Sequence, residues 1–127
     1  MAWETEIYVA SFLDSSINDY GQEIQIFDKP KLFMINHQPV SSFLSYNQYG
    51  SDINSVRRAY PDLDYVGGKI KPKDRVYLID GENYGINLDE LVSSDNEYCN
   101  KANYEVISCM PSKLRMQIDF KKIDKKR

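Results

Sequence analysis

The chain has almost none of the residues on which catalytic and metal sites depend. Its 127 residues include one histidine, His37, and two cysteines, Cys99 and Cys109. A zinc site or a nucleophile–histidine pair would have to be built around His37, and neither cysteine lies at a ligand spacing that would help it. We therefore expect no catalytic residue, no metal site and no cofactor, and we predict that the protein is not an enzyme.

Long apolar runs and a cysteine framework are also missing. The longest apolar runs are only a few residues, so no segment resembles a membrane span or a signal peptide. Two cysteines are too few for a disulfide scaffold. We expect a protein of a reducing cytoplasm, without membrane contact, in which both cysteines are inert packing residues.

Two short patterns suggest chemistry but do not support it. Gly67-Gly68-Lys69 lacks the earlier glycine that a phosphate-binding loop requires at a fixed spacing. The neighbouring carboxylates Asp62 and Asp64, and Asp95 and Glu97, lie in polar stretches where acidic side chains are usually solvated. Neither pattern changes the expectation of a non-catalytic protein.

The net charge of −3 argues against a nucleic-acid binder held by bulk charge. The charge is nevertheless uneven, because residues 1–56 carry two lysines against seven carboxylates while residues 57–75 carry six basic side chains against three acidic ones. The basic segment is either a solvated face or a docking surface for an acidic partner or a phosphate backbone. Interspersed aspartates favour the solvated face.

Tyrosine is abundant, with ten copies, and several fall in expected loops. A loop tyrosine buries a large area with little loss of entropy, so it is a good interface anchor. Together with the basic segment, these tyrosines supply the candidate interface residues: Tyr46, Tyr49, Arg57, Arg58, Tyr60, Tyr65, Lys69, Lys71 and Lys73.

The clearest structural signal lies near the end of the chain. Apolar and polar residues alternate over Lys113–Phe120, which predicts a strand with one buried face. Asn103–Cys109 alternates less cleanly, and Met110-Pro111-Ser112 joins the two runs as the turn of an antiparallel hairpin. Including the strands described next, the side chains expected in the core are Ile7, Val9, Val76, Leu78, Tyr104, Val106, Leu114, Met116, Ile118 and Phe120.

Earlier segments predict further strands and turns. Thr5–Leu13 is rich in β-branched and aromatic residues on both faces, which predicts a central strand. Asp14–Gly21 collects turn-forming residues, and Gln22–Phe27 alternates again, so a hairpin is expected here. A third strand is expected over Leu32–Ile35, reaching towards Gln38-Pro39-Val40.

The middle of the chain mixes strands with irregular stretches. The expected segments are a short helical excursion over Ser41–Asp52, a strand over Ile53–Tyr60, a mobile loop over Pro61–Lys73, a strand over Asp74–Ile79 and a polar, turn-rich stretch over Asp80–Lys101 with one short turn at Leu88–Val92. Short strands with little helix predict an all-β fold, either a small antiparallel β-barrel or a sandwich with long loops. We expect one domain over residues 1–127, with a basic tail at residues 121–127.

Several features occur in an order that resembles a known family. They are the turn Asp19-Tyr20-Gly21-Gln22, the strand end Phe27 with Lys29-Pro30, the strand end Gln38-Pro39-Val40, an excursion bearing Tyr46, Tyr49 and Gly50, then Lys73-Asp74-Arg75-Val76-Tyr77-Leu78, Ala102-Asn103-Tyr104 and the ending Phe120-Lys121-Lys122-Ile123. The sequence resembles the small head–tail connector proteins, also called head-closure or stopper proteins, of tailed bacteriophages and of prophages in Gram-positive bacteria.

The resemblance implies a structural virion protein with no transferable catalytic residues. It implies self-association into a ring below the portal or adaptor ring, closure of the DNA-filled head, docking of a tail-completion protein, and weak contact at most with the channel DNA. The place of such a protein is the bacterial host cytoplasm during assembly and afterwards the virion neck. The alternative is a monomeric, phage-encoded binding module that inhibits or regulates a host protein.

Overall fold

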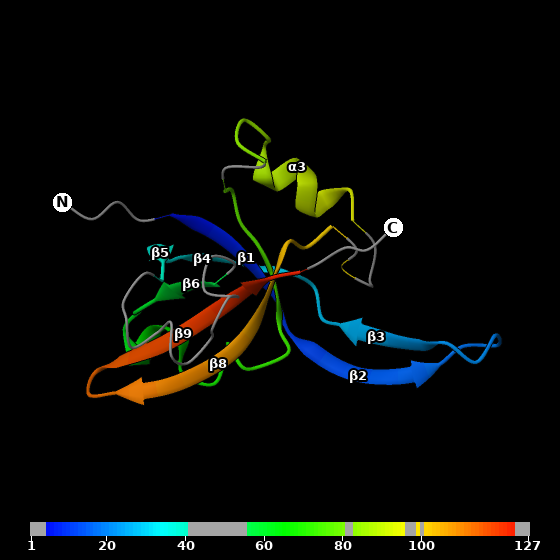
Figure 1. Ribbon diagram of the computed structural model, residues 1–127, viewed down its shortest axis with the longest axis horizontal. Helices are drawn as coiled ribbons and strands as arrows, with labels where there is room; N and C mark the ends of the chain where they lie inside the picture. Colours follow the sequence, from blue (N-terminus) through cyan, green and yellow to red (C-terminus); the bar gives the residue numbers. More distant parts are fainter. Residues whose placement is uncertain (1–4, 41–55, 81–82, 96–98, 100, 124–127) are drawn as a thin grey trace.

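The computed structural model describes residues 5–40, 56–80, 83–95, 99 and 101–123 (Figure 1). Its strands are β1 (Glu6–Ala10), β2 (Phe12–Ile17), β3 (Glu23–Phe27), β4 (Lys31–Met34), β5 (His37–Pro39), β6 (Val56–Ala59), β7 (Arg75–Tyr77), β8 (Tyr104–Ser112) and β9 (Arg115–Lys122), and its helices are α2 (Leu63–Val66) and α3 (Leu88–Ser93). Seven strands form one antiparallel sheet in the order β4-β1-β7-β8-β9-β6-β5, and β2 pairs with β3 separately. The expected all-β class with minor helix is confirmed.

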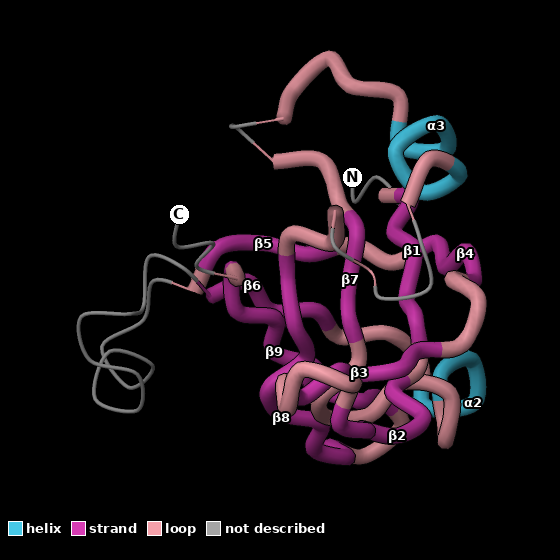
Figure 2. The backbone as a smooth tube through the Cα atoms, turned by 90° about the vertical axis from the view of Figure 1, so that its right-hand side faces the viewer, coloured by secondary structure: helices cyan, strands magenta, loops and turns pink. Residues whose placement is uncertain are grey.

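The large sheet is curled but not closed into a barrel. Its two edge strands, β4 and β5, are joined by only Ile35 and Asn36, and no ladder pairs them. Three Cα–Cα steps span at most about 11 Å, whereas the edges of a flat seven-stranded sheet would lie about 29 Å apart. The sheet must therefore wrap around its core, as the view along the long axis shows (Figure 2). The predicted barrel was wrong, because no ladder of hydrogen bonds joins the edge strands β4 and β5.

The first predicted strand is in fact two strands in different sheets. β1 lies inside the large sheet between β4 and β7, and the chain leaves that sheet at Ser11 to enter β2. The backbone N–H of Phe12 donates to the buried Asp74 carboxylate at 2.9 Å, which holds the chain at this departure point. Half of the segment predicted as a turn, Asp14–Gly21, is strand, because the turn is confined to Asn18–Gln22.

The final hairpin is present, but its turn lies later than predicted. Met110-Pro111-Ser112 belongs to β8, and the turn consists of Lys113 and Leu114, with Ser112 opposite Arg115. Lys113 has a φ of 60°, the sign that the first position of a tight hairpin turn requires. Leu114 is therefore 84% exposed, and its assignment to the core was wrong. Alternation cannot reveal where strand pairing stops.

The other predicted core residues are buried as expected. Ile7, Val9, Val76, Leu78, Tyr104, Val106, Ile118 and Phe120 are at most 5% exposed, and Met116 packs against them while partly buried. The register of β8 and β9 skips Ile107, so this bulge turns Cys109 to the side of the core. A second cluster on the other side of β1 and β7 contains Ala10, Phe27, Tyr77, Leu88, Cys99 and Ala102.

Several segment predictions need correction or confirmation. Pro61–Lys73, expected to be a mobile loop, contains α2 and anchors Val66 and Ile70 in the main core. The expected short turn at Leu88–Val92 is confirmed as α3. The basic tail was placed too early, because Lys121 and Lys122 belong to β9. The excursion over Ser41–Asp52 lies outside the described residues, as do residues 124–127.

Candidate binding cleft

A cleft of about 730 Å³ lies beside the link between the two edge strands. We call it the seam cleft, because it lies where the curled sheet fails to close. Its walls come from the end of β4, the start of β5, the segment from β6 to α2, and the start of β9. The lining residues are Met34, Ile35, Asn36, His37, Gln38, Arg58, Tyr60, Pro61, Asp62, Tyr65 and Arg115.

The apolar part of the cleft is partly exposed and well fixed. Met34, Tyr60 and Tyr65 are 37%, 40% and 41% exposed. The ring of Tyr65 packs edge-on against Phe33 with centroids 5.8 Å apart, and its hydroxyl oxygen accepts a hydrogen bond from the Met34 N–H at 3.0 Å. Tyr60 and Tyr65 were predicted as interface residues, and the fold brings them together here.

Two arginines line the cleft in different roles. Arg58 donates to both carboxylate oxygens of the fully buried Asp119, at 2.7 and 3.1 Å, so its guanidinium is committed to holding β6 on β9. Arg115 is exposed, and one of its nitrogens donates to the Tyr60 carbonyl at 3.0 Å. Arg115 therefore offers charge to a bound partner, while Arg58 does not.

Two buried polar atoms at the β4–β5 link have no hydrogen-bond partner among the described residues: Oδ1 of Asn36 and Nε2 of His37. The Arg57 Nε–H donates to Nδ1 of His37 at 2.7 Å, which assigns the ring proton to Nε2. The link thus presents one buried N–H donor and one buried C=O acceptor. Such unpaired groups are rare in native proteins.

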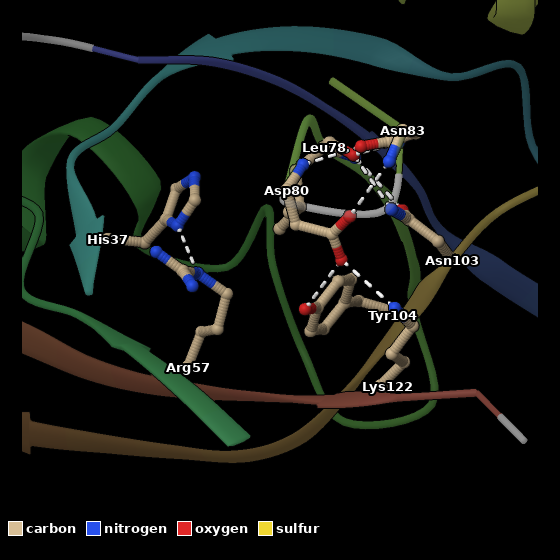
Figure 3. A network of polar contacts seen from close by, with 8 residues as sticks. All are labelled: His37, Arg57, Leu78, Asp80, Asn83, Asn103, Tyr104 and Lys122. Carbon is tan, nitrogen blue, oxygen red and sulfur yellow. Dashed lines mark hydrogen bonds and ion pairs between the residues drawn. The ribbon is translucent and has the colours of Figure 1, made fainter. Parts of the chain in front are cut away.

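The environment of His37 keeps its imidazole neutral. Burial, with a smaller effect from the positive charge of Arg57, lowers the pKa of His37 to about 4, and Asp80 opposes this shift. Arg57 and His37 lie near a separate polar network around Asp80 (Figure 3).

This network ties the loop after β7 to β8 and β9. The Asp80 carboxylate accepts hydrogen bonds from the Tyr104 hydroxyl at 2.9 Å and from Nζ of Lys122 at 3.2 Å. The side-chain amides of Asn83 and Asn103 donate to the Leu78 carbonyl at 2.8 and 2.7 Å. The network is drawn with its bonds in Figure 3. Because these bonds hold the segment after β7 in shape and join it to β8 and β9, we assign the network to the fold.

The His37 pKa makes a testable contribution to acid sensitivity. The unfolded chain takes up a proton near the ordinary histidine pKa of 6.5, whereas the folded chain does so only near 4. Stability linked to His37 is therefore full above pH 6.5 and is lost as the pH falls towards 4, by on the order of 2 kcal/mol at pH 5. Urea unfolding at pH 7 and pH 5 should show a smaller loss for His37→Gln than for the wild type. Equal losses in the two proteins would contradict the assignment.

The predicted basic surface is divided among different contacts. Arg57 bonds His37, Arg58 pairs with Asp119, Nζ of Lys71 lies 3.5 Å from the Asp74 carboxylate, and Nζ of Lys73 lies 5.4 Å from the Phe12 ring centre. Lys69 is exposed. The candidates Tyr46 and Tyr49 lie outside the described residues. Of the candidate interface residues, Arg58, Tyr60 and Tyr65 line one cleft.

The paired strands β2 and β3 form an arm that the candidate residues did not include. We call β2, β3 and the intervening turn Asn18–Gln22 the acidic arm, because residues 12–28 contain four carboxylates and no lysine or arginine. Leu13, Ile17 and Tyr20 on this arm are 58%, 73% and 89% exposed. The sequence signal for this feature was a stretch with four carboxylates and no basic residue.

The described residues contain no group of three or more His, Cys, Asp or Glu side chains placed to hold a metal ion. Within that same part of the chain, no helix has the length and apolar character needed to cross a membrane. The cleft and the acidic arm are the candidate functional features of the described residues.

Comparison with known proteins gives a fold and no function. No protein-family model matches the sequence, and no curated protein matches it. The solution structure of protein SF1141 from Shigella flexneri 2a is similar, with a TM-score of 0.58 and 12% sequence identity over 98% of this chain and 96% of that chain. At that identity the likeness concerns the fold alone.

Proposed function

We propose that this chain is a structural subunit of a phage head–tail connector, which forms a ring below the portal or adaptor, closes the DNA-filled head and docks the tail. The observation that carries the proposal is that the two ends of the molecule bear different structural features. The acidic arm extends at one end of the long axis, while β4, β5 and β6 lie towards the other (Figure 1). A ring needs two different, complementary surfaces on each subunit, and an arm and a cleft at opposite ends would supply them.

The charge distribution supports a channel that DNA passes through without adhering. Several basic side chains lie close to carboxylates of the same chain, as in Arg58–Asp119, Lys71–Asp74 and the 3.8 Å pair Arg75–Glu105. Duplex affinity depends on basic groups that are available to neutralise phosphates. With a net charge of −3 as well, we expect only weak binding of duplex DNA at physiological salt.

The test is removal of the gene from the phage or prophage that carries it. Heads made without the protein should package DNA and then lose it, and they should fail to join tails, as seen by electron microscopy and by nuclease sensitivity of the genome. Supplying the wild-type protein in trans should restore infectious particles. If heads lacking the protein stayed filled and infectious, the connector proposal would be wrong. Recovery of the protein in a complex with a single host protein would support the binding-module alternative.

A further inference from the structure

We propose that the turn of the acidic arm in one copy of this chain docks in the seam cleft of the next copy, with Tyr20 as the buried anchor and Asp19 facing Arg115. This inference rests on the ring assembly of the proposed function and names the contact that builds the ring. The partner is a second copy of the same chain.

The turn presents Tyr20 on a rigid tip. The Asn18 N–H donates to the Gln22 carbonyl at 2.9 Å, and the Gly21 N–H donates to the Asn18 carbonyl at 3.0 Å. The side-chain oxygen of Asn18 accepts from the backbone N–H groups of Tyr20 and Gln22, both at 2.9 Å. Gly21 has a φ of 76°, a left-handed conformation that glycine adopts without strain. Because the tip is already ordered, little entropy is lost when it binds.

Contacts with the rest of the described chain hold the inner half of the arm. Phe12 and Phe27 pack edge-on with centroids 5.7 Å apart, and Arg75 lies over the Phe27 ring and donates to the Gln25 side chain at 2.8 Å. Farther out, Ile17 and Tyr20 are exposed. A two-stranded ribbon is only marginally stable in water, so the outer half gains from burial against another surface.

That surface cannot be the cleft of the same molecule. The arm extends to the right-hand end in Figure 1, whereas β4, β5 and β6, which contribute to the cleft, lie towards the left. An arm tip that fills a cleft must therefore come from another molecule.

The cleft matches the tip in size and chemistry. Its volume of about 730 Å³ accommodates a tyrosine ring and part of a turn, and Met34, Tyr60 and Tyr65 provide apolar walls.

Charge favours the same pairing. The arm has no basic residue, and Asp19 is exposed beside Tyr20 at its tip. On the cleft side, Arg115 is exposed, and Lys113 lies two residues away in the turn of the final hairpin. These two positive charges compare with one carboxylate in the lining, Asp62. Complementary charge at the rim of an interface directs association and fixes its orientation.

A contact between arm and cleft is heterologous, so each bound copy leaves one arm and one cleft free. Successive copies then form a closed ring when the rotation between them divides the circle, and a filament when it does not. This is the geometry that a connector ring requires.

The first experiment compares two tyrosines of equal exposure. Tyr20 and Tyr84 are 89% and 87% exposed, so neither substitution by alanine should alter the thermal unfolding of the subunit. Sedimentation velocity over a concentration series should show self-association weakened about tenfold or more by Tyr20→Ala and unchanged by Tyr84→Ala. Equal behaviour of the two variants would overturn the proposal.

Charge reversal tests the same contact by rescue, because a variant that had lost its fold could not regain self-association through a second substitution. Asp19→Arg and Arg115→Asp should each weaken self-association, and the double variant should restore it, because the opposed charges are exchanged across the same contact. Failure of the double variant to recover would argue against this pairing.

Disulfide capture tests the contact even when association is weak. In a Cys109→Ser background, a mixture of Tyr20→Cys and Met34→Cys chains should give a mixed disulfide dimer on mild oxidation, and a mixture of Tyr84→Cys and Met34→Cys should not. Absence of a mixed dimer in the first mixture would refute the docking. A small molecule found in the cleft would be a different occupant and would also refute the docking.

The outcome is separable from that of the connector proposal. If Tyr20 and the cleft cross-link but heads close without the protein, the docking stands and the connector function fails. If the protein closes heads equally well with Tyr20→Ala and gives no cross-link, the function stands and the docking fails.

Discussion

Replacing Phe120 by alanine should lower the free energy of unfolding by about 3–5 kcal/mol, because the substitution removes buried apolar surface and leaves a cavity that the sheet cannot fill. Phe120 is fully buried in β9, opposite Val106 of β8 and Arg57 of β6, at the centre of the curled sheet. Denaturation by guanidinium chloride, with the midpoint and slope compared between variants, measures the loss.

A matched control lies in the turn that precedes the same strand. Leu114 is 84% exposed, so Leu114→Ala should change stability by less than about 0.5 kcal/mol. A small effect at Phe120, or a large effect at Leu114, would show that the core is organised differently from this description.

The second large effect is expected at Arg58. Arg58→Ala should destabilise the protein by about 3–5 kcal/mol, because it removes the guanidinium from a carboxylate that remains buried. Asp119 is fully buried, and its side chain is bonded by Nε and Nη2 of Arg58. Equilibrium unfolding of Arg58→Ala and Arg58→Lys separates charge from geometry, since lysine keeps the charge but cannot make the two-point contact.

Replacing both Arg58 and Asp119 gives an informative comparison with the single variant. Arg58→Met with Asp119→Leu should destabilise less than Arg58→Ala alone, since no charge is then left buried without its partner. If the double replacement proved worse than the single one, the pair would contribute more than mutual neutralisation, and this account of it would have to be abandoned.

Much of the core could be predicted from local pattern. Alternation in the last strand identified Ile118 and Phe120 as buried, and the apolar opening segment identified Ile7 and Val9. These predictions succeed because side chains on a strand alternate between faces, whatever strand lies beside it. Alternation failed at Leu114, because the position of a two-residue turn depends on how far the opposite strand continues to pair.

The candidate site was less accessible to sequence reasoning. Tyr60 and Tyr65 were identified as interface residues from their type and expected loop position, and they do line the cleft. Arg115 and Met34 were missed, because they join the cleft through contacts between segments far apart in the chain. Tyr20 was noticed only within a turn motif, since nothing local shows that its strands leave the main sheet.

By itself, the sequence determined the antiparallel strands, most of the buried face and the scarcity of catalytic side chains, all of which follow from composition and short-range periodicity. Only the tertiary structure decided that β4 and β5, two residues apart in the chain, become the opposite edges of one sheet. It also decided that a carboxylate at position 119 lies buried beneath Arg58. The physical reason is that strand order and sheet curvature arise from pairing and packing between segments far apart in the chain. The local sequence pattern does not determine them.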